Sequence, residues 1–248
     1  MDRPLRIKIF ADGADLDAML RLAADPRIGG FTTNPTLMRK AGVADYETFA
    51  RRVLEAIPDR PVSFEVFADD FPEMERQARA IAAWGPNVYV KIPVTDTAGN
   101  SAAPLIARLS SGGIAVNVTA VLTLRQVRDC ADALAAATPA IVSVFAGRIA
   151  DTGVDPVPVM AEALKILAAR PRAELLWASP REILNVVQAD AIGCPIVTVT
   201  SELLAKLPLI GRDLAVLSRE TVEMFRRDAL AAGYTIRTDT TPIRAATP

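Results

Sequence analysis

Eight short runs of β-branched and apolar residues recur along the chain at nearly even spacing. They cover residues 6–12, 30–34, 62–67, 88–92, 115–120, 141–145, 174–178 and 195–200. Successive runs are about 22 to 33 residues apart, the length of one strand plus one helix in an α/β protein. The spacing therefore predicts a single (β/α)8 TIM barrel. The alternative is an open doubly wound sheet, although no GxGxxG motif follows the first run and eight units exceed what most open sheets need.

The segments between these runs have the periodicity of amphipathic helices. Met74, Ala78 and Ile81 would share one helix face. A last helix over about residues 213–232 would end before Gly233, a residue typical of a helix C-cap. No linker divides the 248 residues. We therefore expect residues 1–235 to form one barrel domain with a C-terminal helix, and residues 236–248 to form a flexible tail.

Composition excludes several classes of protein. The chain has no histidine, which excludes Ser-His and Cys-His nucleophiles and the histidine ligand sets of zinc enzymes. Cys130 and Cys194 are far apart and form no CxxC motif, so we expect neither a disulfide framework nor a thiolate zinc site. Lys plus Arg is 28 and Asp plus Glu is 29, and this balance predicts no nucleic-acid or membrane partner. The charged first residues and the lack of a long apolar stretch predict a cytoplasmic protein without a signal peptide.

Polar residues occupy alternate positions in the predicted strands. One set of alternate positions is almost entirely apolar, whereas the other set is polar toward the carboxyl end of each run. The polar set contains Asp12, Thr32, Asn34, Ser63, Glu65, Tyr89, Lys91, Asn117, Thr119, Ser143, Ser179, Thr198 and Thr200. An interior that only had to pack would be filled with Val, Ile and Leu, and barrel active sites lie at the carboxyl ends of the strands. The alternation therefore predicts a polar site at that end of the barrel.

Lys91 gives the sharpest single indication of chemistry. It lies in the apolar run VYVKIPV, where burying a charged ammonium is costly. Burial favours the uncharged amine, which can attack a carbonyl and form a Schiff base. The alternative is a buried ion pair with Glu65 that only joins two strands. In the catalytic interpretation Glu65 moves protons, directly or through a water held by Thr119.

Two further residues have both a functional and a structural interpretation. Asp12 ends the first run, where it could accept the proton of a substrate hydroxyl, or it could cap a helix that begins near Asp15. Asn34 precedes Pro35, and Asn-Pro pairs commonly start a turn.

Basic residues after the sixth and seventh runs suggest an anion site. Arg148 follows the sixth run, and Ser179-Pro180-Arg181-Glu182 follows the seventh. The latter segment has the pattern of a capping box, with Ser179 expected at the N-cap. A helix N-terminus between two arginines is also suited to phosphate, which the late loops of such barrels often bind.

Together these segments resemble the transaldolase family, and the short chain resembles its small subgroup, which includes the fructose 6-phosphate aldolases. The motifs run in order from about residue 7 to residue 205. They are Asp12, FTTNPT at 31–36, Glu65, VYVKIPVT at 88–95, NVT at 117–119, SVFAGR at 143–148 and ASPR at 178–181.

The resemblance implies a barrel of the class I aldolase type that needs no metal or organic cofactor. Its expected reaction passes a dihydroxyacetone unit from a ketose phosphate to an aldose phosphate through a lysine Schiff base. By motif, Lys91 would form the imine, Glu65 and Thr119 would serve acid–base catalysis, and Asp12 would accept the proton at the cleaved bond. The expected substrate-binding residues are Thr32, Asn34, Asn117, Ser143, Phe145, Arg148, Ser179 and Arg181. The resemblance also implies a homo-oligomer, a pentamer or decamer.

Two positions separate transfer from simple cleavage within this resemblance. Fructose 6-phosphate aldolases carry Gln where this chain has Glu65 and Tyr where it has Phe145, so the pair seen here favours transaldolase activity. Cleavage and synthesis with free dihydroxyacetone is the alternative. The chain departs from the family pattern at Pro180, where Phe is frequent, and at Val144, where Pro is usual.

Overall fold

Eight parallel strands close into a barrel in which each strand pairs with the next in sequence and β8 pairs with β1. The computed structural model describes residues 5–238. The strands are β1 (Lys8–Asp12), β2 (Ile28–Thr32), β3 (Val62–Glu65), β4 (Val88–Pro93), β5 (Val116–Val121), β6 (Ala140–Val144), β7 (Ala173–Trp177) and β8 (Ile196–Thr200). Each overlaps one of the eight predicted runs. The predicted (β/α)8 barrel is confirmed, and the open sheet is wrong.

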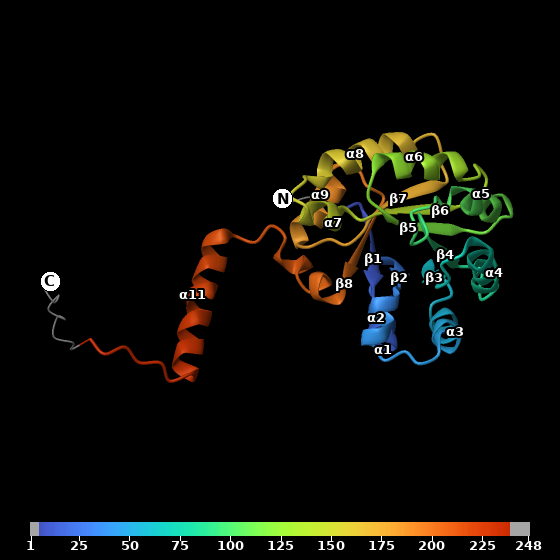
Figure 1. The fold of residues 1–248 in the computed structure, drawn as a ribbon. Helices are drawn as coiled ribbons and strands as arrows, with labels where there is room; N and C mark the ends of the chain where they lie inside the picture. The colour runs from blue at the N-terminus through green and yellow to red at the C-terminus, as the bar shows by residue number, and fades with distance from the viewer. Residues whose placement is uncertain (1–4, 239–248) are drawn as a thin grey trace, which may run out of the picture. The chain divides into compact units, whose positions relative to one another are not determined.

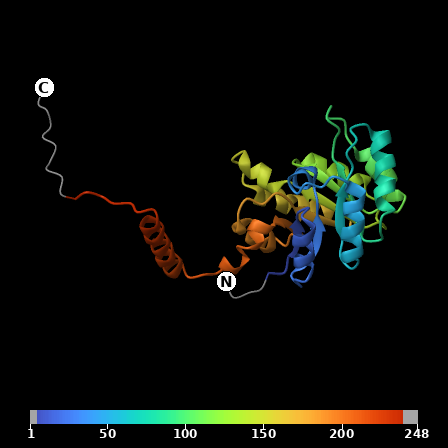
Figure 2. The ribbon, with the colours of Figure 1, turned by 90° about the horizontal axis from the view of Figure 1, so that it is seen from below.

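Helices connect the strands and lie on the outside of the barrel (Figures 1 and 2). They are α1 (Leu16–Ala23), α2 (Pro35–Lys40), α3 (Tyr46–Ala56), α4 (Phe71–Ala82), α5 (Ala103–Ser111), α6 (Leu124–Ala133), α7 (Ala146–Asp151), α8 (Pro156–Leu167), α9 (Ile183–Ala191) and α10 (Ser201–Leu204), followed by a 3-10 turn at Leu207–Leu209. In the part of the chain that the structure describes, no helix combines the length and the apolar character needed to span a bilayer.

Local sequence explains where the helices begin and which face they bury. The Asp45 and Asp70 side chains accept hydrogen bonds from the first turns of α3 and α4, so that each helix starts immediately after its capping aspartate. The predicted face of α4 is buried: Met74, Ala78 and Ile81 are each at most 4% exposed. These helices therefore cover the barrel with the apolar faces that their spacing predicts.

The barrel interior consists of two layers of different chemistry. One layer is apolar, and its cluster contains Phe10, Ile141, Leu176, Ala178 and Ile196, with Tyr89 and Phe145 packed against it. Phe10 fills this layer because Gly30 on the neighbouring strand has no side chain, and a Cβ there would lie 2.6 Å from the Phe10 ring. The polar residues form the second layer; Asp12, Ser143 and Thr198, for example, come two residues after Phe10, Ile141 and Ile196.

We expect Gly30→Ala to destabilise the barrel by about 1–3 kcal/mol, because the new methyl group overpacks the space occupied by Phe10. Gly29→Ala is a matched control one residue away, since its Cβ would lie 3.5 Å from Lys8 Cβ, an ordinary contact. Urea unfolding of both variants measures the difference. Equal unfolding free energies for the two variants would contradict the role given to Gly30.

The described residues divide into two compact units: residues 5–207, which hold the barrel, and residues 208–238. The described part of the second unit contains α11 (Leu214–Ala231), the helix expected near residues 213–232. Asp213 caps it by accepting from Val216 N–H. One domain over residues 1–235 and a tail over 236–248 stay predictions, and residues 239–248 lie outside the described residues.

Candidate active site

A cavity of about 530 Å³ lies at the carboxyl ends of the barrel strands. Nearly all of the predicted site residues line it: Asp12, Thr32, Asn34, Glu65, Lys91, Thr119, Ser143, Phe145, Arg148, Ser179 and Arg181. Asn117 is the exception, because it is fully buried and acts on the cavity through its neighbours. Parallel register brings these side chains together, since every strand ends at the same edge of the barrel.

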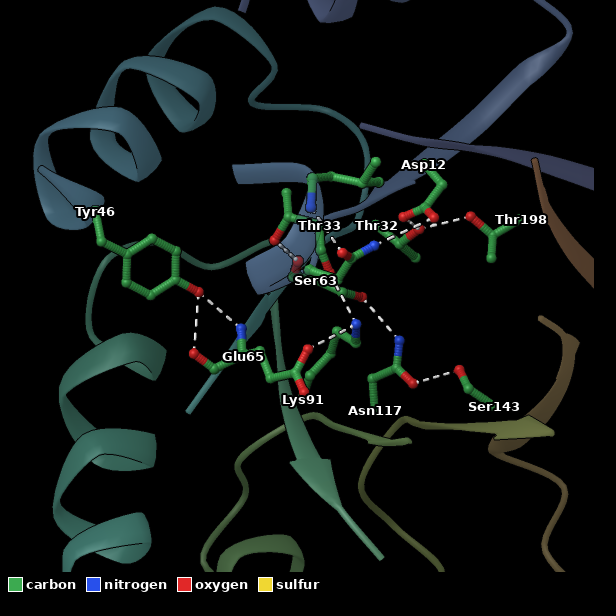
Figure 3. A network of polar contacts seen from close by, with 12 residues as sticks. Asp12, Thr32, Thr33, Tyr46, Ser63, Glu65, Lys91, Asn117, Ser143 and Thr198 are labelled. Carbon is green, nitrogen blue, oxygen red and sulfur yellow. Dashed lines mark hydrogen bonds and ion pairs between the residues drawn. The ribbon is translucent and has the colours of Figure 1, made fainter. Parts of the chain in front are cut away.

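Lys91 is held between a carboxylate and a backbone carbonyl (Figure 3). Glu65 and Lys91 are direct cross-strand partners on β3 and β4, and Glu65 Oε2 lies 3.0 Å from Lys91 Nζ. Lys91 Nζ also donates to the Thr33 carbonyl at 2.8 Å. The lysine is only 6% exposed, yet it lines the cavity. The ion pair therefore exists, and it lies where a carbonyl compound in the cavity would meet the amine.

Asp12 is held by two side chains of the β2 end. Its Oδ1 accepts from Thr32 Oγ1 at 2.8 Å, and Asn34 Nδ2 lies 3.4 Å from its Oδ2. Burial raises the pKa of the Asp12 carboxyl, although Lys91 and these hydrogen bonds oppose the shift. The cap of α1 is Asp15, which accepts from Ala18 N–H, so the helix-cap interpretation of Asp12 is wrong.

Asn34 caps a helix and also faces Asp12. Its side-chain oxygen accepts from Leu37 N–H at 2.9 Å and caps α2, while its amide nitrogen faces Asp12. Because the oxygen is used by the helix, the orientation of the amide group is fixed, and its N–H donors are directed at the site.

A series of side-chain hydrogen bonds joins β3, β5 and β6 below the cavity residue Ser143. Asn117 Nδ2 donates to Ser63 Oγ at 3.0 Å, and Asn117 Oδ1 accepts from Ser143 Oγ at 2.6 Å. The only hydroxyl hydrogen of Ser143 is therefore used in the hydrogen bond to Asn117, and the Ser143 oxygen can only accept a hydrogen bond from a group in the cavity.

Arg148 and Arg181 form the basic end of the cavity. The Arg148 guanidinium carbon lies 5.4 Å from the Phe145 ring centroid. Arg181 pairs through Nε and Nη2 with Asp151, the last residue of α7, and its Nη1 lies 3.1 Å from Ser179 Oγ. Arg181, and then Arg148, lower the pKa of Asp151, so this carboxylate stays charged and fixes the Arg181 fork.

The capping role predicted for Ser179 is wrong. Helix α9 begins at Ile183 with Glu182 at its N-cap, and Ser179 has φ of 62°, which an N-cap in extended conformation does not adopt. This turn carries the Ser179 carbonyl against Gly147, where a Cβ would lie 1.6 Å from that oxygen. Gly147 therefore allows the loops after β6 and β7 to meet.

Backbone strain marks the rim of the cavity. Among the described residues, the non-glycine positions with positive φ are Ala120 (59°) and Ser179, and both line the cavity. Ala120 lies at a register shift between Val118 and Val121 in the pairing of β5 with β6. Such conformations cost about 1–3 kcal/mol each and concentrate at functional sites.

Three residues at the site were given no individual role in the sequence prediction. Thr198, which belongs to the predicted polar set, lines the cavity, and its Oγ1 lies 2.5 Å from Thr32 Oγ1. Asp151 lies three residues after Arg148 on α7, a helical spacing that places both near one another. Tyr46 contacts the Glu65 backbone from α3, and no pattern in the sequence indicates that contact.

Residues 5–238 contain no group of three or more Cys, Asp or Glu side chains that could hold a metal ion.

The chain matches the family described as Transaldolase/Fructose-6-phosphate aldolase over residues 9–239. It is 34% identical over 202 residues to a "Probable transaldolase" of Dehalococcoides mccartyi, covering 81% of this chain and 90% of that protein. It is 36% identical over 193 residues to a "Probable transaldolase" of a Roseiflexus species, covering 77% and 85%. A "Probable transaldolase 2" of Listeria monocytogenes is 34% identical over 202 residues, covering 81% and 88%.

Solved structures share the barrel at much lower identity. A putative phosphonomutase from Burkholderia cenocepacia has a TM-score of 0.56 at 13% identity, covering 87% of this chain and 94% of that one. A 2,3-dimethylmalate lyase has a TM-score of 0.54 at 16% identity, covering 95% and 87%. At these identities the likeness concerns the fold alone.

Proposed function

The chain belongs to the transaldolase/fructose-6-phosphate aldolase family, and from this premise we propose that it is a transaldolase. In the proposed reaction, Lys91 binds a ketose phosphate as an imine, and a dihydroxyacetone unit passes to an aldose phosphate. The observation that carries the proposal is the buried Lys91 amine, 3.0 Å from the Glu65 carboxylate and open to a polar cavity. Such a pair supplies a nucleophile and a proton carrier in one place.

Imine formation requires proton movement around Lys91. The protonated Lys91 side chain gives a proton to Glu65, and the resulting neutral amine attacks the ketose C2 carbonyl with its lone pair, which forms a carbinolamine after a proton moves from nitrogen to oxygen. Glu65 then returns a proton to the carbinolamine hydroxyl, which leaves as water as the C=N bond forms. Thr119, whose side chain faces the same cavity, holds the water that relays these protons.

Asp12 serves the cleavage step. Its carboxylate takes the proton of the C4 hydroxyl as the C3–C4 bond breaks. The electron pair of that bond moves toward the iminium, which becomes an enamine. The aldose then leaves, and the reverse sequence joins the enamine to the acceptor aldehyde. The hydrogen bonds from Thr32 and Asn34 hold the carboxylate in place for this transfer.

Polar side chains divide the remaining contacts with the substrate. Asn34 and Ser143 hold the hydroxyls of the three-carbon unit, with Thr32 behind Asp12 and Asn117 behind Ser143. Arg148, Arg181 and Ser179 bind the phosphate at the basic end of the cavity. Asp151 keeps Arg181 extended toward Ser179, so the guanidinium is oriented before substrate arrives.

We favour transfer over simple cleavage because of Glu65 and Phe145. A carboxylate beside Lys91 can cycle its proton while the enamine waits for an acceptor, and Phe145 offers no hydroxyl that would protonate the enamine and release it. The amount of free dihydroxyacetone released from fructose 6-phosphate, measured with and without an acceptor, tests this preference for transfer. We expect sugar exchange when an aldose phosphate is added, and little dihydroxyacetone release without it. Rapid release that no acceptor alters would assign the chain to aldol cleavage instead.

We also propose that the protein is a homo-oligomer. The described part of the second unit has a helix, α11, with no buried residue. Its Leu214, Val222 and Phe225 are 79%, 63% and 63% exposed, and their spacing places them on one helix face. An apolar face of this kind suits contact with another copy of the chain, and sedimentation analysis distinguishes an oligomer from a monomer.

A further inference from the structure

The hydrogen-bond ladder between β2 and β3 stops short of the residue that pairs with Lys91. Phe31 N–H donates to Pro61 O at 2.9 Å, and Thr33 N–H donates to Ser63 O at 3.2 Å. In a continued parallel ladder, the next two bonds would join Glu65 N–H to the Thr33 carbonyl and the N–H of residue 35 to the Glu65 carbonyl.

Neither of these two bonds forms. Residue 35 is proline, which has no backbone N–H to donate. The Thr33 carbonyl accepts from Lys91 Nζ at 2.8 Å instead of from the backbone. The backbone groups of Glu65 on this side of β3 would therefore be left without their usual partners, at a cost of about 1–3 kcal/mol for each buried group.

The Tyr46 hydroxyl supplies both missing partners (Figure 3). It accepts from Glu65 N–H at 2.7 Å and donates to the Glu65 carbonyl at 3.1 Å. Burial raises the pKa of Tyr46, so the phenol stays neutral and keeps the proton that it donates.

Aromatic packing fixes this hydroxyl in place. The Tyr46 ring centroid lies 6.1 Å from that of Phe64, 4.7 Å from that of Phe67 and 5.4 Å from that of Trp84. Tyr46 is also the first residue of α3, which Asp45 caps. The ring is thus held by groups that do not line the cavity, and only its hydroxyl reaches the strand.

We infer that Tyr46 is a positioning residue for Lys91. By taking the place of β2 at the Glu65 backbone, its hydroxyl leaves the Thr33 carbonyl free to hold the Lys91 amine. The same two bonds hold the end of β3, and with it the Glu65 carboxylate, beside that amine. The inference rests on the proposed function, because it concerns the reactivity of Lys91 as a nucleophile.

Tyr46→Phe tests the inference, since it removes only the oxygen and keeps the ring packing. Without the hydroxyl, Glu65 N–H competes for the Thr33 carbonyl, and the amine loses the acceptor that orients it. We expect kcat and the initial rate of borohydride-trapped adduct to fall about tenfold. The KM for fructose 6-phosphate should change less than about twofold, because the residues proposed to hold the sugar lie on other strands.

Tyr89→Phe is the matched control. Tyr89 precedes Lys91 on β4 and packs in the apolar layer of the barrel, so the same loss of an oxygen there should leave the trapping rate unchanged. Both variants are compared at a temperature where circular dichroism shows them folded. A wild-type trapping rate in Tyr46→Phe, or an equal fall in both variants, would overturn the inference. A wild-type protein that forms no adduct would overturn the proposed function instead.

Discussion

Replacing Lys91 with alanine is expected to lower turnover at least about a thousandfold and to abolish the adduct trapped by borohydride with fructose 6-phosphate. The imine requires a nitrogen nucleophile at this position, and alanine supplies none. Intact-mass spectrometry of the borohydride-treated protein measures the adduct directly, and circular dichroism checks that the variant is folded. We expect it to fold, because the truncated residue lines a polar cavity where water can enter and solvate Glu65.

Lys8→Ala provides the matched control for this variant. Lys8 lies on β1 and pairs with Glu174 at 2.6 Å, so it is also a strand lysine in an ion pair, but it does not line the cavity. An exposed pair of this kind contributes about 0–1 kcal/mol, and activity should be retained. An adduct that persists in Lys91→Ala would place the imine on another lysine and refute the assignment.

Asp12→Asn is expected to lower kcat by about 10²- to 10⁴-fold while leaving the borohydride adduct in place. The amide cannot accept the C4 hydroxyl proton, so carbon–carbon cleavage slows, whereas imine formation depends on Lys91 and Glu65. Trapping and turnover measured on the same sample separate the two steps. Loss of both together would show that Asp12 acts before cleavage.

Asp15→Asn is the control for this substitution. Asp15, three residues after Asp12, caps α1 and does not line the cavity that contains Lys91. Asn and Asp are about equally good N-cap residues, so this variant should keep both stability and activity.

The raised pKa of Asp12 gives the pH dependence a definite sign. Cleavage needs the carboxylate, so activity should fall as the pH drops through a value above the ordinary range for aspartate. Stability has the opposite sign. A carboxyl whose folded pKa is raised contributes stability that is fully present below the unfolded pKa and is lost as the pH rises through the folded value. Asp12→Asn should therefore not be destabilised at neutral pH, which urea unfolding at pH 7 measures.

The fold followed from the sequence because its signals are periodic and local. A strand and helix repeat of about 22 to 33 residues, with apolar residues on alternate strand positions, fits few architectures other than an eightfold barrel. The same alternation indicated which side chains face inward. It identified Asp12, Glu65 and Lys91 before their contacts were known, because polar residues in otherwise apolar strands are costly unless they are used.

The loop between β7 and α9 shows where a local sequence pattern predicts the wrong helix start. The segment from Ser179 to Glu182 has the residues of a capping box, but the helix begins one turn later. Contact between the loops after β6 and β7, through Gly147, places Ser179 at positive φ, and this tertiary contact overrides the local preference for a cap.

By itself, then, the sequence determined the barrel, the edge at which its polar groups gather, and the family to which the chain belongs. Only the tertiary structure decided three contacts. The Thr33 carbonyl accepts a hydrogen bond from Lys91, the Tyr46 hydroxyl replaces the missing strand partner of the Glu65 backbone, and Asp151 pairs with Arg181. The physical reason is one of range. Periodicity depends on neighbours a few residues apart, whereas a hydrogen bond depends on tenths of an ångström between groups that only the closed barrel brings together.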